Sequence, residues 1–261
     1  MVNPPPLIVL IGGTDSSGGS GLGADIEVMN SLGATFLPVI SAITQQRNNA
    51  PVRITAVPQH GIASQLQSLF DLPISAVKIG MLPDEKAVKS VCQFLSHISL
   101  KKVVLDPVLR TSSGDQLISE NGWSSLIDQL IPLTGLITPN LYEAYELLGL
   151  KIKGIPHETL VRKCGSLSDK AVLLKGGHMG GDNSRDLLFQ PNQSISEYNW
   201  ERVKGGTSVR GTGCRLASAI AYFWAVEDNL TCAVSKAGNF VQAYIRKSTT
   251  SAPEPYGSVL Q

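Results

Sequence analysis

The sequence predicts an α/β fold with a mainly parallel central sheet, helices on both faces and a small antiparallel edge. Short runs rich in Val, Ile and Leu alternate with longer stretches of helical spacing along most of the chain. This alternation is typical of parallel strands that are joined by crossover helices and covered on both faces. After Lys175 the pattern changes, and two neighbouring segments there favour an antiparallel hairpin at the edge of the sheet.

Each expected element follows from its own run of residues. The strands are expected at Leu7–Ile11, Leu37–Ile43, Ala76–Gly80, Lys102–Leu105, Gly135–Ile137 and Ala171–Leu174, with the hairpin at Arg185–Phe189 and Ser194–Trp200. The helices are expected at Gly23–Leu32, His60–Phe70, Asp84–Ser96, Gly122–Gln129, Leu141–Leu148, His157–Ser166, Cys214–Ala225 and Thr231–Lys247. No internal repeat or linker divides the chain, so a single domain is expected over residues 1–261.

Composition excludes several classes of protein. The 261 residues are 43% hydrophobic and 16% charged, with a formal net charge of +1, so the basic face of a nucleic-acid binder is not expected. The opening MVNPPPLIVLIGG has no basic start and only a short apolar run, which argues against a signal peptide and a membrane span. Four widely spaced cysteines without a C-x-x-C pair favour free thiols and a cytoplasmic location.

A glycine-rich turn, GGTDSSGGSGLGAD, follows the first expected strand at residues 12–25. Residues 19–24 satisfy G-x-G-x-x-A, a pattern of dinucleotide sites, but the next strand should then end near an acidic residue. It runs instead into Thr44, Gln45, Gln46 and Arg47, which makes a dinucleotide site a weak hypothesis. No G-x-x-x-x-G-K-[ST] run is present, so a Walker-type phosphate loop is excluded.

A second glycine-rich turn lies in VRGTGCRLASAIAYFWA, residues 209–225. Gly211 and Gly213 allow backbone N–H groups to point into one concavity, and the helix that follows adds the positive end of its dipole. The turn therefore predicts an anion site for a phosphate or a developing oxyanion. The same field should lower the pKa of Cys214, which would then act as a base or nucleophile. The alternative is that Cys214 is a small buried residue at a helix start.

The order of these motifs resembles the ribokinase-like superfamily, in its branch of hydroxymethylpyrimidine and phosphomethylpyrimidine kinases of thiamin biosynthesis. GTGC before an apolar helix matches the branch, whereas the sugar kinases carry an aspartate in place of Cys214. The resemblance covers roughly Leu7 to Lys247. It rests on the first turn and on SAITQQRN (41–48), AVKIGML (76–82), VVLDPVL (103–109), SSGDQL (112–117), LITPNLYEA (136–144) and AVLLKGGH (171–178).

The resemblance implies a kinase that uses ATP and Mg²⁺ and a small aminopyrimidine substrate with a hydroxymethyl arm. It implies substrate contacts from Gly13, Asp25, Gln46, Met81 and Val108, and ATP contacts from Asn140, Lys175 and Thr212. Asp106 and Glu143 match the acids near the metal, and both are oxygen donors of the kind that Mg²⁺ prefers. Cys214 would accept the hydroxymethyl proton while the Gly211–Gly213 turn holds the transferring phosphoryl group. Members of the branch are commonly dimers, so a homodimer is expected.

The chain departs from the usual residues of this branch near both turns. Arg210 stands in place of histidine, and it would aid charge neutralisation beside the phosphates. Arg215, Ala217, Gly23, Arg47 and Ser112 are further departures. Two alternatives therefore stay open, a pyridoxal or pyridoxine kinase of the same superfamily and a catalytically weak pyrimidine-binding sensor.

Overall fold

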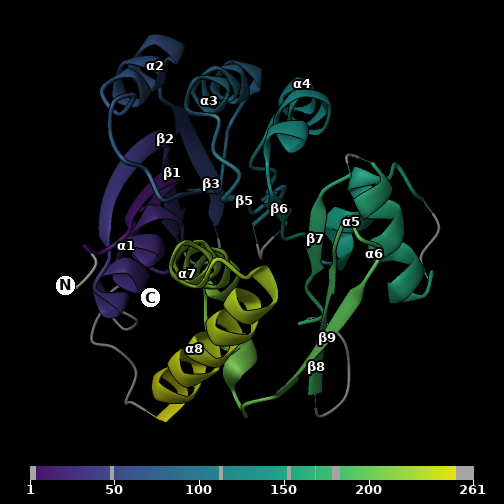
Figure 1. Cartoon of the computed structure of the whole chain (residues 1–261). Helices are drawn as coiled ribbons and strands as arrows, with labels where there is room; N and C mark the ends of the chain where they lie inside the picture. The colour runs from purple at the N-terminus through teal and green to yellow at the C-terminus, as the bar shows by residue number, and fades with distance from the viewer. Residues whose placement is uncertain are drawn as a thin grey trace.

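A computed structural model describes residues 4–47, 50–111, 114–151, 154–167, 169–177 and 183–250, with the side chains of 46, 47, 50 and 51 outside that description. Its strands form one sheet in the order β3-β2-β1-β4-β5-β6-β7-β8-β9 (Figure 1). Six neighbouring strands, from β2 to β7, are parallel, and β3, β8 and β9 run antiparallel at the two edges. The predicted fold class is therefore confirmed.

The strands largely coincide with the expected apolar runs. They are β1 (Leu7–Asp15), β2 (Thr35–Arg47), β3 (Ala50–Ala56), β4 (Ala76–Ile79), β5 (Val103–Leu105), β6 (Leu136–Ile137), β7 (Ala171–Leu174), β8 (Asn183–Phe189) and β9 (Ile195–Glu201). The predicted hairpin is confirmed as β8 and β9. The sequence prediction missed β3, and it ended β2 four residues too early.

The helices also lie where helical spacing indicated. They are α1 (Gly21–Leu32), α2 (Gln59–Gln67), α3 (Glu85–Ile98), α4 (Glu120–Ser125), α5 (Leu141–Leu147), α6 (His157–Ser166), α7 (Thr212–Glu227) and α8 (Leu230–Thr250). The helix expected at Gly122–Gln129 is split, because α4 continues into a π-helical turn at Leu126–Leu130. None of the helices in the described part of the chain is long and apolar enough to span a bilayer.

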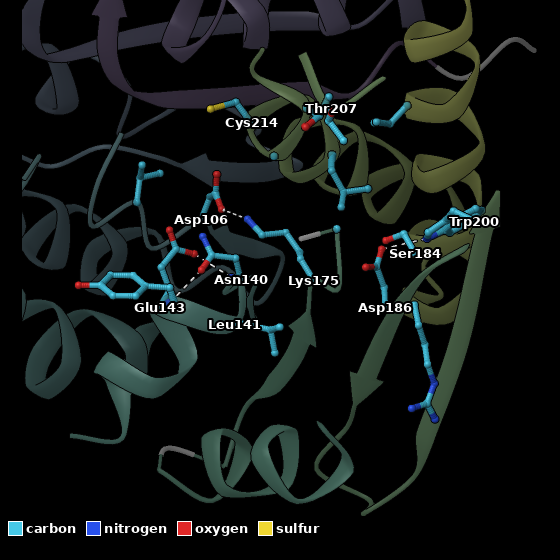
Figure 2. Close-up of a pocket in the computed structure, with 18 of the residues that line it drawn as sticks. Asp106, Asn140, Leu141, Glu143, Lys175, Ser184, Asp186, Trp200, Thr207 and Cys214 are labelled. Atoms are coloured by element: carbon cyan, nitrogen blue, oxygen red, sulfur yellow. Dashed lines mark hydrogen bonds and ion pairs between the residues drawn. The ribbon is translucent and has the colours of Figure 1, made fainter. Parts of the chain in front are cut away.

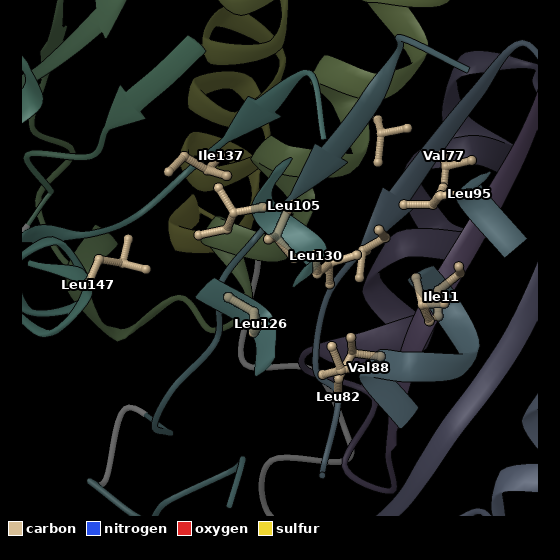
Figure 3. Close-up of a cluster of buried hydrophobic side chains, with 14 of the residues drawn as sticks. Ile11, Val77, Leu82, Val88, Leu95, Leu105, Leu126, Leu130, Ile137 and Leu147 are labelled. Atoms are coloured by element: carbon tan, nitrogen blue, oxygen red, sulfur yellow. The ribbon is translucent and has the colours of Figure 1, made fainter. Parts of the chain in front are cut away.

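Two cores lie on opposite faces of the sheet, because successive side chains of a strand point to opposite sides. Val9 and Ile11 of β1 join the core under α2–α6, part of which appears in Figure 3, whereas Ile8 and Leu10 join the core under α1, α7 and α8. All four side chains are fully buried. Because the six parallel strands are covered on both faces, their free carboxyl ends are the natural place for a ligand.

Gly238 lets α8 pack against β9. A Cβ atom at this position would lie 2.1 Å from Cζ2 of Trp200, so the indole ring occupies the place of a side chain. In an open helix, replacing glycine with alanine stabilises a protein by up to about 1 kcal/mol. Here the new methyl group can be accommodated only if the ring or the helix moves.

We therefore expect Gly238→Ala to lower the free energy of unfolding by about 1–3 kcal/mol, the usual cost of overpacking a core. The matched control is Gly23→Ala in α1, where a Cβ atom would meet its nearest neighbours at 3.8 Å. That control should be neutral or stabilising. Urea denaturation of both variants measures the difference, and equal stabilisation by the two would contradict the packing of Trp200 on α8.

Candidate active site

A cleft of about 1820 Å³ opens at the carboxyl ends of the parallel strands (Figure 2). One wall is formed by the segments that follow β5, β6 and β7, and the opposite wall by the start of α7 and by α8. The cleft is lined by nine of the residues expected at the site. These are Asp106, Val108, Asn140, Glu143, Lys175, Thr212 and Cys214, together with Gly211 and Gly213 of the second turn.

Three neighbouring strand ends converge on one carboxylate. Asp106, which follows β5, is buried, and its Oδ1 accepts a 2.7 Å hydrogen bond from Nζ of Lys175 after β7. The hydroxyl of Thr138, after β6, donates to the same oxygen at 3.2 Å. Burial lowers the pKa of Lys175, but the attraction of Asp106 and Glu143 outweighs it and raises that pKa above its ordinary value. Lys175 is therefore a fixed positive charge in the cleft.

Glu143 and Asn140 form a reciprocal cap at the start of α5. The Asn140 side chain accepts from the Glu143 N–H at 2.9 Å, and the Glu143 carboxylate accepts from the Asn140 N–H at 2.8 Å. Burial raises the pKa of Glu143 to about 7, against the opposing effect of Lys175. The same capping box thus fixes both residues in this wall of the cleft, close to Asp106.

The second glycine-rich turn packs directly on the first. Gly211 has a φ of +68°, and a Cβ atom there would lie 2.2 Å from the carbonyl oxygen of Gly19. A Cβ atom at Gly213 would lie 3.4 Å from Nζ of Lys175 and 3.9 Å from Oδ2 of Asp106. The start of α7 therefore faces the ion pair across the cleft, with its backbone close to the Lys175 ammonium.

Cys214 lies in the first turn of α7, half-buried and lining the cleft. The predicted lowering of its pKa is wrong. Burial raises the pKa of the Cys214 thiol, although Lys78 and the backbone N–H of Gly21 act in the opposite direction. The sequence argument counted the helix start but could not include the loss of solvation in the folded chain, which disfavours a charged thiolate.

Asp25 is not exposed to the cleft. Its carboxylate is fully buried between α1, α7 and β4, where it accepts from Nζ of Lys78 at 2.7 Å and from the hydroxyl of Ser218 at 2.8 Å. Both carboxylate oxygens thus have partners within the protein, and the side chain is fully buried. Burial raises the pKa of Asp25, while Lys78 counteracts that rise.

The residues expected to cover a substrate ring lie beside one another. A Cβ atom at Gly13 would lie 2.9 Å from Sδ of Met81, so the two residues are in close contact and a larger residue at position 13 would require the Met81 side chain to shift. Met81 is buried in a small cluster with Ala42 and Leu117, and Val108 packs against this cluster. The side chain of Gln46, the fifth expected substrate contact, lies outside the described residues.

The two arginines near the second turn have different surroundings. Arg210 donates to the hydroxyl of Ser17 at 2.9 Å and forms a 3.4 Å ion pair with Asp15, so it links the second turn to the first. Arg215 is buried, pairs with Glu27 and lies over the ring of Tyr244 at 4.1 Å. Arg215 therefore joins α7 to α1 and α8. The side chain of Arg47 and the whole of Ser112 lie outside the described residues.

Sequence reasoning missed Lys78 and the Asp186–Trp200 pair. Lys78 is fully buried in β4, and a lysine inside the apolar run AVKIG was the available signal for a buried ion pair. Asp186 accepts from the Gly176 N–H at 2.8 Å and from the Trp200 indole at 2.9 Å. It thereby holds the turn after Lys175 against β9, and no local sequence pattern indicated this contact.

Comparison with known proteins extends these observations. Residues 15–258 match the family model for phosphomethylpyrimidine kinase. The hydroxymethylpyrimidine/phosphomethylpyrimidine kinase of Aquifex aeolicus is 35% identical, over 91% of this chain and 93% of its own length. The protein of that name from Escherichia coli is 33% identical, over 92% and 91%.

Solved structures indicate the same family. A phosphomethylpyrimidine kinase from Clostridium difficile superposes with a TM-score of 0.77 at 32% identity, covering 95% of this chain and all of that one. A pyridoxal kinase from Staphylococcus aureus in complex with AMP-PCP has a TM-score of 0.81 at 25% identity, over 94% and 89%. The expected ribokinase-like architecture is thus confirmed, and the chain is a phosphotransferase that belongs to the phosphomethylpyrimidine kinase family.

Proposed function

We propose that the protein phosphorylates 4-amino-5-hydroxymethyl-2-methylpyrimidine, its monophosphate or both, with ATP as the phosphate donor, as a step of thiamin biosynthesis. The observation that carries the proposal is the cleft itself, in which the Lys175–Asp106 pair faces the start of α7 and Cys214. Relatives with the corresponding activity in their names match more than 90% of the chain. We further propose a cytoplasmic homodimer, as expected from the resemblance.

The proposed reaction transfers the γ-phosphoryl group to the hydroxymethyl oxygen. That oxygen bonds to phosphorus, its proton passes to the sulfur of Cys214, and the bond from phosphorus to the oxygen of ADP breaks. The backbone of Gly211–Gly213 would hold the phosphoryl group, and Lys175 would neutralise its charge, because such reactions depend on positioning and electrostatics. Asn140 and Thr212, which line the cleft, are the proposed ATP contacts. Gly13, Gln46, Met81 and Val108 are the proposed ring contacts.

The residues in the cleft fit the expected Mg²⁺ ion. Asp106 and Glu143 offer carboxylate oxygens, the ligand type that Mg²⁺ prefers. The described residues contain no cluster of three or more His, Cys, Asp or Glu side chains, so the protein would supply few ligands. This suits an ion that usually keeps several waters and binds through one or two carboxylates and the substrate phosphates. Bound Mg²⁺ would neutralise charge on the phosphates of ATP.

A pyridoxal kinase is the second candidate, as the resemblance of the sequence left open. A pyridoxal kinase from Staphylococcus aureus bound to pyridoxal superposes with a TM-score of 0.83. That likeness, at 24% identity, supports the fold and not the substrate. Membership of a kinase family disfavours the third hypothesis, a pyrimidine-binding sensor without turnover.

The first prediction concerns the acceptor. With Mg²⁺-ATP, we expect ADP release in the presence of hydroxymethylpyrimidine or its monophosphate, with a higher kcat/KM than for pyridoxal. A coupled assay with the three acceptors in parallel measures this. Turnover of pyridoxal alone would transfer the protein to the second candidate function, and binding of the pyrimidine without ADP release would favour a sensor.

The second prediction concerns Cys214. We expect Cys214→Ala to reduce kcat for the alcohol by about 10²–10⁴, the usual loss when a positioned base is removed. The reduction should be smaller for the monophosphate, because a phosphate oxygen that is already ionised has no proton to lose. Cys232→Ala is the matched control, since that half-buried cysteine lies on α8 and contacts Glu227. Unchanged turnover in Cys214→Ala would make this cysteine structural.

The third prediction concerns pH. A base acts in its deprotonated form, and burial raises the pKa of Cys214, so the active thiolate fraction should increase with pH through and above neutrality. We expect kcat/KM for the alcohol to rise between about pH 7 and pH 9, approaching tenfold per unit. The Cys214→Ala variant should lack this dependence. The same slope in both proteins would show that another group controls the reaction.

A further inference from the structure

Helices α1 and α7 pack against each other. The backbone N–H of Gly21 acts on the Cys214 thiol and favours a lower pKa. Four residues further along each helix, the hydroxyl of Ser218 donates to Asp25 at 2.8 Å. Residues four apart share one helix face, so Cys214 and Ser218 are neighbours on α7, as Gly21 and Asp25 are on α1. The buried carboxylate thus lies one helical turn below the thiol.

A buried ammonium group accompanies this carboxylate. Nζ of Lys78 lies 2.7 Å from Oδ2 of Asp25, and the two side chains are 1% and 0% exposed. A Cβ atom at Gly80 would lie 2.8 Å from the same Nζ, so the ammonium group reaches past the end of β4, toward the edge where the cleft opens. Burying an ion pair is expensive, and hydrophobic residues of similar size would often be at least as stable. Packing alone therefore does not account for Lys78.

The charged groups that act on Cys214 are Lys78 from β4, Asp25 from α1, Asp106 after β5 and Lys175 after β7. Lys78 and Lys175 are the cations, of which Lys78 is the more deeply buried, and the two carboxylates act against a thiolate. Burial lowers the pKa of Lys78, but Asp25, Cys214 and Asp106 together raise it above its ordinary value, so this lysine keeps its proton. A permanent positive charge thus lies beside the carboxylate of α1 and acts on the thiol of α7.

We propose that Lys78 is a positioning residue for phosphoryl transfer, whose buried ammonium group is a counter-charge of the Cys214 thiolate and is held in place by Asp25. The proposal deepens the proposed function and rests on it for the role of the thiolate in turnover. The electrostatic coupling between the Lys78 ammonium group and the Cys214 thiol does not depend on any substrate. It can therefore be measured on the thiol of the intact protein without ATP.

The experiment follows the alkylation of Cys214 by iodoacetamide against pH, with the modified peptide quantified by mass spectrometry. The test variant is Asp25→Asn/Lys78→Met, which removes both charges and leaves no unpaired ion. Because Lys78 acts on the thiol more strongly than Asp25 does, we expect the alkylation midpoint to move to higher pH. At a fixed pH below the midpoint, Cys214 should react more slowly, by about tenfold for each pKa unit by which the midpoint rises.

Two controls separate this effect from a general loosening of the site. Ser218→Ala removes a hydrogen bond to Asp25 but keeps both charges, and it should leave the midpoint within a few tenths of a unit. Lys236→Met/Glu227→Gln removes an exposed ion pair between α8 and the end of α7, and it should also leave the midpoint unchanged. An unchanged midpoint in the test variant overturns the proposal, as does an equal shift in Ser218→Ala.

A second charge-neutral variant provides the test if Asp25→Asn/Lys78→Met does not fold. Asp25→Asn/Lys78→Gln keeps two polar groups that can hydrogen-bond each other, and its cooperative thermal unfolding establishes that it is native. The same upward shift of the midpoint is expected, and no shift rejects the proposal. If the thiol shifts as expected but Cys214→Ala retains full turnover, the counter-charge is real and the base role of Cys214 is wrong. The two failures are therefore distinguishable.

Discussion

The ion pair between Lys175 and Asp106 is the interaction on which the rest of the site depends. It joins the end of β7 to the end of β5 across β6, and β6 contributes Thr138 to the same carboxylate oxygen. Parallel strands place all these ends at one edge, so residues separated by 69 positions in sequence meet at 2.7 Å. Without this contact, the wall of the cleft that follows β5, β6 and β7 would consist of three independent loops.

Two buried Lys–Asp pairs flank the thiol, and they differ in exposure. Lys175 is 15% exposed and borders the cleft, where a ligand's charge can reach it, whereas Lys78 is 1% exposed and responds mainly to groups of the protein. Each ammonium group is balanced by an aspartate, and burial raises the pKa of Glu143 to about 7. The cleft is thus prepared for phosphate charge without carrying a large unbalanced charge of its own.

Much of the fold could be predicted from sequence because the six parallel strands are covered on both faces and read as continuous apolar runs. Strand β3 was missed because APVRITA alternates polar and apolar residues at a sheet edge and begins close to a proline. The site residues were found as separate motifs, but their partners were not. Asp25 and Lys78 are 53 positions apart, and the sign of the Cys214 pKa shift depends on their joint burial, which no local pattern contains.

The two glycine-rich turns pack so closely that the residues allowed in one depend on those in the other. The carbonyl oxygen of Gly19 occupies the space that a side chain at position 211 would need, and the guanidinium group of Arg210 lies against Gly19 and pairs with Asp15. An insertion or a larger residue in either turn would displace the other, together with the start of α7. The two turns lie almost 200 residues apart in the sequence. Substitutions in one turn are therefore expected to be accompanied by substitutions in the other during evolution.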